Sequence, residues 1–217
     1  DSSPSRGLGD VYKRQVVLAA GQSRRMGKIN KLTAVVAGKP VIRHVVDTVL
    51  EAGFKDIVVV LGYDEQAVSA CLEGLPVRFV KNEAFRSGQA SSVSAGIAAL
   101  DNNVSDAMVV LGDMPLLNAA LLNNLHHHHM RNPQHEQMIS LPVCLKDRES
   151  QVGHPVIWGR QFFPDLQALT GDQGGRQIWS DHPAIINQMD VEDATLFLDT
   201  DTAEALRRAE VLLLARN

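Results

Sequence analysis

The chain has 217 residues, of which 45% are hydrophobic, enough apolar material for one sizeable core. Its 21 Lys and Arg against 25 Asp and Glu give a formal charge of -4, which argues against the broad positive surface that duplex nucleic acid requires. The two cysteines are too few for a disulfide framework, and no apolar run is long enough for a membrane span or a signal peptide, so we expect a cytoplasmic protein without membrane partners.

Residues 1–15 have the composition of a loop and run abruptly into the apolar Val16. They resemble a tag or translated adaptor fused to an altered gene start, so we expect a non-native or disordered leader. A native flexible leader is the alternative, and both interpretations predict the same function. We assign residues 16–217 to a single domain.

Short apolar runs then alternate with amphipathic stretches along the chain. Strands are expected at residues 16–20, 57–61, 77–81, 108–111, 138–142 and 196–198. Helices are expected at residues 41–50, 65–73, 90–100, 119–130, 161–169 and 202–214, with Gly53 as the C-cap of the first and Thr202 as the N-cap of the last. This alternation predicts an α/β fold, a three-layer α/β/α sandwich with a mostly parallel, Rossmann-like sheet. Ligands of such sheets bind at the carboxyl ends of the strands.

The first expected strand runs into a Gly-rich loop, LAAGQSRRMG, at residues 18–27. Small residues and Gly21 let the backbone approach a ligand closely, while consecutive amides and the nearby Arg24, Arg25, Lys28 and Lys31 supply donors for a triphosphate. The loop has neither the spacing of a Walker A motif nor the G-x-G-x-x-G of dinucleotide sites. An ordinary turn with solvated basic residues is the alternative.

Acidic residues follow two further expected strands. Asp113 lies in the turn Leu-Gly-Asp-Met-Pro, and Mg²⁺ is commonly held by one or two carboxylates plus substrate phosphates, so Asp113 is our preferred metal ligand. Asp199 and Asp201 could contribute on the opposite side of the same site. The alternatives are an Asx-turn role for Asp113 and a helix-capping role for Asp201.

The combination LAAGxSxRMGxxxKL, GDMP and D-x-D-T-x-E resembles the nucleotidyltransferase family that includes the molybdenum cofactor guanylyl- and cytidylyltransferases. The resemblance runs from about Val16 to the C-terminus. Residues 82–92, 153–155 and 171–176 are similar to the cytidylyl branch, whereas the guanylyl branch has G-P-L-x-G in the first of these segments. Ala203 departs from the family, which usually has Pro there.

The resemblance implies a role for residues in three parts of a site. Backbone groups of the Gly-rich loop would contact the nucleotide, at Leu18, Ala19, Ala20 and Gly21. Arg25 and Lys31 would neutralise its phosphates, and Asn82 would lie near the base or ribose. Asp113 would bind Mg²⁺, with Asp201 and then Asp199 as further metal ligands. His154 and Arg176 would face the acceptor.

The activity implied by the resemblance is transfer of CMP from CTP to the terminal phosphate of a molybdopterin-type cofactor, with release of pyrophosphate. Lys31, Asp113 and Arg25 would be the catalytic residues. One alternative is a guanylyltransferase or another small-molecule nucleotidyltransferase, acting on a sugar or polyol phosphate. Another is a non-catalytic carrier that delivers the cofactor to a molybdoenzyme client.

Four consecutive histidines occupy residues 126–129. Adjacent residues on a helix point about 100° apart, so at most His126 and His129 share a face. We expect a solvated helix face here, with adventitious metal binding as an artefact to control for.

Overall fold

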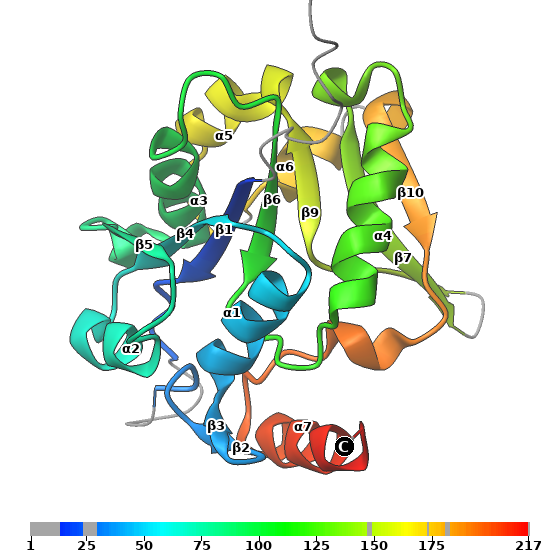
Figure 1. Ribbon diagram of the computed structural model, residues 1–217. Helices are drawn as coiled ribbons and strands as arrows, with labels where there is room; N and C mark the ends of the chain where they lie inside the picture. Colours follow the sequence, from blue (N-terminus) through cyan, green and yellow to red (C-terminus); the bar gives the residue numbers. More distant parts are fainter. Residues whose placement is uncertain (1–13, 24–29, 147–148, 173, 181–182, 217) are drawn as a thin grey trace, which may run out of the picture.

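The computed structural model describes residues 14–23, 30–146, 149–172, 174–180 and 183–216 (Figure 1). A central eight-stranded sheet lies between two layers of helices. The three-layer α/β/α sandwich with a mostly parallel sheet is therefore confirmed.

The strands of the sheet lie in the order β10-β7-β9-β6-β1-β4-β5, and β8 pairs with β7. Their bounds are β1 (Arg14–Ala19), β4 (Asp56–Leu61), β5 (Arg78–Lys81), β6 (Asp106–Leu111), β7 (Ile139–Lys146), β8 (Glu149–Val152), β9 (Val156–Gly159) and β10 (Ile186–Asp190). A separate two-stranded ribbon joins β2 (Val35–Val36) to β3 (Lys39–Pro40). Strands β6, β1, β4 and β5 are parallel, whereas β9 runs antiparallel to β6 and β7. The residues just before β9 therefore lie beside the carboxyl end of β6.

Each face of the sheet is covered by its own helices. One layer contains α1 (Val41–Glu51), α2 (Glu65–Cys71) and α4 (Ala119–Met130). The other contains α3 (Gln89–Ala98), α5 (Phe163–Ala168) and α6 (Arg176–Ser180). Side chains of β1 alternate between them, because successive strand residues point to opposite faces: Val17 and Ala19 join the first core, Val16 and Leu18 the second.

The last helix, α7 (Ala203–Arg216), lies beside β2 at the carboxyl-end side of the sheet (Figure 1). Thr202 is its N-cap, as predicted, since Thr202 Oγ1 accepts from the amide of Ala205 at 3.1 Å. Short 3-10 helices complete the fold at η2 (Phe85–Ser87), η3 (His135–Gln137), η4 (Arg160–Phe162), η5 (Pro183–Ile185) and η6 (Ala194–Phe197). None of the helices that the structure describes combines the length and apolar character needed to traverse a bilayer.

Most of the expected elements are confirmed. Five of the six strands appear as β1, β4, β5, β6 and β7, and α4 has the expected bounds. Gly53 follows α1 with a φ of +83°, the left-handed C-cap conformation that glycine adopts without strain.

The strand expected at residues 196–198 is wrong, because this segment enters the 3-10 helix η6. The Asp193 carboxylate accepts from the amide of Thr195 at 2.9 Å and begins the turn. The Leu198 amide then donates to the Thr195 carbonyl at 3.2 Å, an i to i+3 bond that belongs to a 3-10 helix and not to a strand. A short apolar run does not distinguish the two structures by itself.

The first strand begins at Arg14, within the leader expected for residues 1–15. Arg14 and Gln15 belong to β1 and are buried, and the Arg14 guanidinium pairs with Asp56 and with Asp101, the latter at 3.0 Å. Residues 1–13 lie outside the described part of the chain.

The solvated face expected for the histidine run is wrong for two of its members. His126 and His129 do share a face of α4, but they are 7% and 0% exposed. Leu122 and Leu125 on the same helix are buried in the core, so α4 turns this side toward the sheet.

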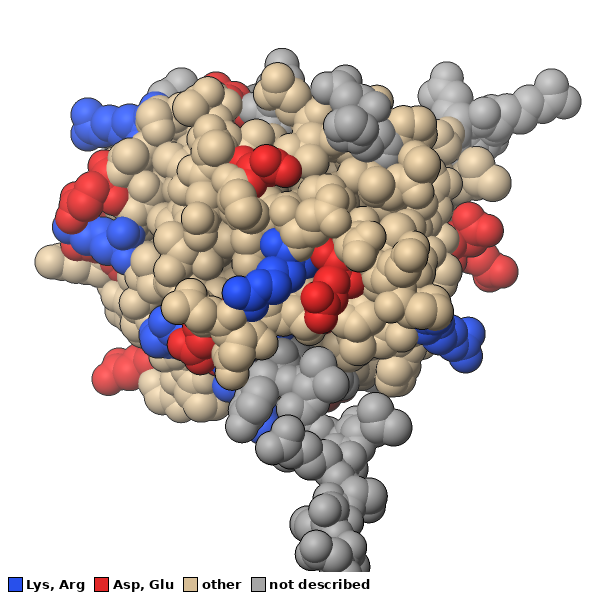
Figure 2. Space-filling view, turned by 90° about the horizontal axis from the view of Figure 1, so that it is seen from above, with Lys and Arg blue, Asp and Glu red and all other residues tan. Residues whose placement is uncertain are grey.

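Figure 2 shows the opposite side of the sheet from α7, at the amino ends of the parallel strands. Acidic and basic side chains are interspersed there among uncharged ones, and the described residues form no wide basic patch on this face. The distribution agrees with the small net charge of -4.

Candidate active site

Two adjoining cavities open at the carboxyl ends of β1 and β6. The first, of about 410 Å³, is lined by the Gly-rich loop, Lys31 and the acids Asp113, Asp199 and Asp201. The second, of about 420 Å³, extends toward β9 and α6. Both are in the size range of small-molecule sites. They share a wall formed by Leu18, Gln89 and Leu111.

The Lys31 ammonium lies between two carboxylates of the first cavity. It forms ion pairs with Asp113, which follows β6, and with Asp201, which precedes α7. Burial alone would lower the pKa of Lys31, but the two carboxylates outweigh it, so the pKa of Lys31 is raised above its ordinary value. Lys31 is therefore charged at neutral pH, and the structure brings together three of the residues predicted from sequence.

The position of Lys31 is set by its neighbours in the loop. The Lys31 amide donates to Ser23 Oγ at 3.1 Å, and the Leu32 amide donates to the buried Asn30 Oδ1 at 3.1 Å. Asn30 Nδ2 also reaches Asp64 Oδ2 at 3.4 Å. Sequence reasoning missed Asn30, whose signal was a small amide residue directly before the key lysine.

Thr200 ties the two acidic segments together, and it too was missed. Its amide and its Oγ1 both donate to the Asp113 carbonyl, each at 3.0 Å, and the residue is fully buried. This clamp holds Asp199 and Asp201 beside the turn after β6. A hydroxyl residue between two acids was the available signal.

The acids fit a divalent cation with oxygen ligands. Asp113 and Asp201 reach one and the same ammonium, so their carboxylates can also share one ion. Burial, followed by the charges of Asp201 and Asp113, raises the pKa of Asp199, so these acids repel one another unless a cation lies nearby. Two carboxylates leave room for phosphate oxygens as the remaining ligands.

The Gly-rich loop contributes unequally to the first cavity. Leu18, Ala20 and Gly21 line it, but the Ala19 methyl group points to the opposite face of the sheet and joins the core beneath α1. The Leu18 carbonyl accepts from the amide of Gly112 at 3.0 Å. Arg25, a predicted phosphate ligand, lies outside the described residues.

Asn82 lies behind the wall of the first cavity, to which its neighbour Ser92 belongs. It is 4% exposed and lines neither cavity, because its amide nitrogen donates to Ser91 Oγ at 2.9 Å and Ser92 Oγ at 3.0 Å. Its Oδ1 accepts from the amide of Ala84 at 2.9 Å. Asn82 therefore shapes the loop between β5 and α3. From that loop the exposed Arg86, a cation missed by sequence reasoning, lines the first cavity.

The same loop requires a glycine at position 88. Gly88 has a φ of +117°, and a Cβ there would lie 2.3 Å from the Gly171 carbonyl oxygen. That oxygen accepts from the amide of Ala90 at 3.1 Å. The close approach seats the turn at Gly171 and Asp172 against the start of α3, and Asp172 completes the wall of the first cavity.

Two tryptophans dominate the second cavity. The rings of Trp158 and Trp179 stack with centroids 5.5 Å apart and planes 25° apart. A Cβ on Gly175 would lie 2.2 Å from the Trp158 ring, so the glycine permits this packing. Arg176 lines the same cavity at the start of α6. Flat apolar surface beside a cation suits a planar ligand with an anionic group.

His154 also lines the second cavity and precedes a cis proline, Pro155. Burial lowers the pKa of His154 to about 4, although the charge of Asp113 opposes the shift. The ring is therefore neutral at neutral pH. The predicted acceptor residues His154 and Arg176 thus line the same cavity, which meets the predicted nucleotide residues only at the shared wall, through Leu18.

Residues 15–186 match the protein family described as the MobA-like NTP transferase domain, a span that includes Lys31, Asp113, His154 and both tryptophans. The chain belongs to this family. The nucleotidyltransferase family expected from the motifs is thereby confirmed.

Relatives of this family differ in how much of the chain they share. Nicotine blue oxidoreductase of Paenarthrobacter nicotinovorans is 29% identical over 194 residues, which is 89% of this chain and 94% of that protein. The bifunctional protein GlmU of Sinorhizobium fredii is 40% identical over 111 residues, but these are 49% of this chain and only 24% of GlmU.

Among solved structures, Rv0371c from Mycobacterium tuberculosis H37Rv superposes with a TM-score of 0.77 at 26% identity, covering 92% of this chain and 98% of that one. A complex of Rv0371c with manganese superposes with a TM-score of 0.72 at 25% identity, covering the same shares of the two chains. The fold is thus shared over nearly the whole chain, and one of the relatives carries the name of an oxidoreductase.

Proposed function

We propose that this chain is a cytoplasmic nucleotidyltransferase that transfers CMP from CTP to the terminal phosphate of a molybdopterin-type molybdenum cofactor and releases pyrophosphate. The observation that carries the proposal is the pair of adjoining cavities, one with Lys31 between two carboxylates and the other with a stacked tryptophan pair. The similarity of residues 82–92 and 153–155 to the cytidylyl branch supports the choice of base and acceptor. Residues 16–217, together with Arg14 and Gln15 of β1, would act as one catalytic domain.

The triphosphate would occupy the first cavity. Lys31 and Arg86 line it, and Arg25 would add a third cation, so three positive charges could face the phosphates. When Lys31 binds a phosphate oxygen it releases the carboxylates of Asp113 and Asp201. Mg²⁺ bound on these two carboxylates would neutralise phosphate charge and make the α-phosphorus more electrophilic.

The acceptor would occupy the second cavity. The Trp179 ring, stacked on the buried Trp158, would offer a flat apolar surface for a fused ring system, and Arg176 would supply a partner for its phosphate. The neutral His154 adds a hydrogen-bonding group without adding charge. A phosphate nucleophile is already ionised near neutral pH, so no general base is required. The work of the protein is to orient the two substrates across the shared wall.

Two alternatives concern the acceptor and turnover. The chain could be a guanylyltransferase or act on a sugar or polyol phosphate, because the first cavity alone does not determine the acceptor. It could also be a carrier that delivers the cofactor to a molybdoenzyme without turnover. Lys31, Asp113 and Asp201 in one cluster favour catalysis over a carrier.

The decisive experiment combines the protein and Mg²⁺ with each of the four ribonucleoside triphosphates and a panel of acceptors, while pyrophosphate is measured. We expect release only with CTP and a molybdopterin-type acceptor. Release with a sugar or polyol phosphate instead would overturn the acceptor assignment, and binding without release would favour the carrier.

A further arm of the assay follows from the oxidoreductase name of one relative. A reduced nicotinamide nucleotide is added with and without the acceptors, and its oxidation is followed by absorbance. Oxidation that depends on acceptor, with no pyrophosphate released in the first arm, would contradict nucleotidyl transfer.

A further inference from the structure

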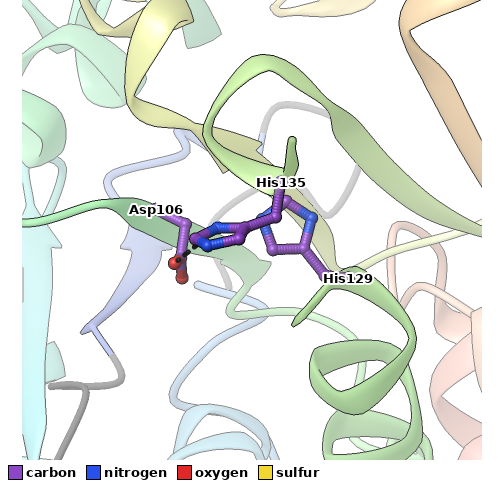
Figure 3. A group of neighbouring side chains, drawn as sticks. All are labelled: Asp106, His129 and His135. Atoms are coloured by element: carbon purple, nitrogen blue, oxygen red, sulfur yellow. Dashed lines mark ion pairs between the residues drawn. The ribbon is translucent and has the colours of Figure 1, made fainter. Parts of the chain in front are cut away.

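A second cluster of ionisable residues lies at the other end of β6, remote from Asp113. Asp106 begins β6, His129 lies in the last turn of α4 and His135 begins η3, and their side chains point toward one another (Figure 3). One nitrogen from each histidine and one oxygen of Asp106 all lie within 4.8 Å of one another. His135 Nδ1 is 3.8 Å from Asp106 Oδ2.

The cluster is nearly dry and incompletely bonded. Asp106 and His129 are 4% and 0% exposed. Among the described residues, neither His129 Nε2 nor His135 Nδ1 has a hydrogen-bond partner, although both atoms are buried. Buried polar atoms are nearly always bonded in folded proteins, so two such nitrogens facing one carboxylate require an explanation.

The other nitrogen of His129 is held in place. His129 Nδ1 lies 2.7 Å from Ser140 Oγ, which also accepts from Asn187 Nδ2 at 3.1 Å. Ser140 Oγ has two lone pairs and can accept the Nδ1 hydrogen of His129 as well. That tautomer leaves a lone pair on Nε2, and fixing the distal nitrogen in this way is what metal-binding histidines commonly show.

We propose that Asp106, His129 and His135 form a binding site for a transition-metal ion such as Zn²⁺ or Co²⁺. Two imidazole nitrogens and one carboxylate suit these ions, whereas Mg²⁺ prefers oxygen ligands throughout. The site is therefore chemically distinct from the pair Asp113 and Asp201, and it does not depend on the proposed transferase activity.

The Asp106 carboxylate keeps capacity to bind a cation. Ser105 Oγ donates to Asp106 Oδ2 at 2.8 Å. A carboxylate has about four lone-pair sites, so this bond leaves the group able to ligate an ion beside the two histidines.

His135 gives the cluster its route to solvent. Its side chain is 18% exposed, and it lies on a 3-10 helix of only three residues. Ligand atoms around one such ion lie roughly 3 to 3.5 Å apart when each is about 2.0 to 2.2 Å from the metal. A small rotation of the His135 side chain would shorten the 3.8 Å distance from its Nδ1 to Asp106 Oδ2 into this range. Water could complete the coordination. The ion would then join α4 and η3 to the start of β6.

Co²⁺ titration of the untagged full chain tests the site, with visible absorption and the Tm as readouts. Excess Mg²⁺ is present to occupy the carboxylates of the active site. We expect one Co²⁺ per chain, a rise in Tm, and an affinity at least about tenfold weaker in both His135→Ala and Asp106→Asn. His127→Ala, which removes an exposed member of the histidine run, is the matched control and should bind as the parent does.

Unchanged Co²⁺ affinity in His135→Ala would overturn the proposal. Loss of binding in His127→Ala with retention in His135→Ala would also overturn it, since the ion would then lie on the exposed histidines. Circular dichroism without metal checks the fold of each variant. Should the buried Asp106→Asn variant fail to fold, the partly exposed His135 decides the result by itself.

Discussion

The two ends of β6 carry similar residue types in opposite environments. At the carboxyl end, Asp113 lies in an open cavity and its charge is balanced by Lys31. At the amino end, Asp106 is buried beside two histidines, one of which cannot take up a proton near neutral pH. The first arrangement has a counter-ion that an incoming phosphate can displace. The second has buried histidine nitrogens that lack a hydrogen-bond partner among the described residues.

The difference indicates that the role of an acidic residue in this fold depends on its position along the strand. An acid at the carboxyl end can bind a ligand, whereas an acid at the amino end is enclosed by packing. Carboxyl ends of the strands open onto loops that can leave a cavity, whereas their amino ends are closed by packing. We therefore expect changes at Asp113 to act on turnover, and changes near Asp106 to act on stability and metal binding.

The largest expected effect comes from Asp113→Ala. Loss of one carboxylate from the proposed Mg²⁺ site should lower pyrophosphate release by about 10³-fold, or about 4 kcal/mol of transition-state stabilisation. Steady-state rates at saturating CTP measure it. Asp47→Asn, in a surface ion pair with Lys39, should leave the rate unchanged. Near-normal turnover in Asp113→Ala would remove the metal assignment.

Acidification should destabilise the fold through two histidines, His129 near the amino end of β6 and His154 in the second cavity. The folded pKa values of His129, about 3, and His154, about 4, lie below the ordinary 6.5, so the unfolded chain binds protons first as the pH falls. The contribution of these histidines to stability is fully present above about pH 6.5. The free energy of unfolding should therefore fall by a few kcal/mol toward pH 4. Urea unfolding at several pH values measures it. His129→Gln should give a shallower slope, and an identical slope would contradict this account.

A pair of glycine variants sharpens the account of the first cavity. Gly88→Ala should lower the free energy of unfolding by about 3 kcal/mol, because its methyl group meets the Gly171 carbonyl in addition to the positive φ. Gly74→Ala has a positive but smaller φ of +80° and open space around it, so about 1 kcal/mol is expected. Equal losses in the two variants would show that the contact with Gly171 is unimportant.

Arg176→Ala separates the two cavities. The KM for the acceptor should rise about 30-fold, the equivalent of about 2 kcal/mol for a charged hydrogen bond, while the KM for CTP stays unchanged. Arg208→Ala, on the exposed surface of α7, is the matched control. Equal increases in both constants would place Arg176 outside the acceptor site.

The smallest expected effect is that of Thr200→Val. It removes the Oγ1 hydrogen bond to the Asp113 carbonyl but keeps the amide bond, so about 1 kcal/mol of stability should be lost. The apparent affinity for Mg²⁺ should fall with it. Thr200→Ser should restore both properties, and failure to do so would indicate a role of side-chain volume instead.

Sequence alone predicted the parts of the fold with the strongest patterns. Strands buried on both faces, such as β4 and β6, are continuous apolar runs and were found. The edge strand β10, Ile186–Asp190, mixes polar and apolar residues and gave no signal. Strand β9, Val156–Gly159, was also missed. The apolar residues 196–198 gave a false one, because they pack as a turn of 3-10 helix.

The candidate site was predictable where one rule was sufficient, namely that loops at the carboxyl ends of parallel strands meet at one edge of the sheet. Lys31, Asp113 and Asp201 meet because their loops end at the same edge of the sheet. To predict the role of Thr200 one would need to know which backbone carbonyl its hydroxyl reaches, across 87 residues of chain. His129 required knowledge of which face of α4 packs on β7, and the helical period alone does not say which side turns inward.

The wall shared by the two cavities has a consequence for redesign and for evolution of the site. A change of bulk at Leu18, Gln89 or Leu111 alters the shape felt by both ligands, so it cannot retune one preference while sparing the other. Residues such as Arg86 and Trp179 each line one cavity alone and are free of this coupling. Substitutions that change the acceptor should therefore occur among the residues of β9 and α6, while the shared wall stays unchanged.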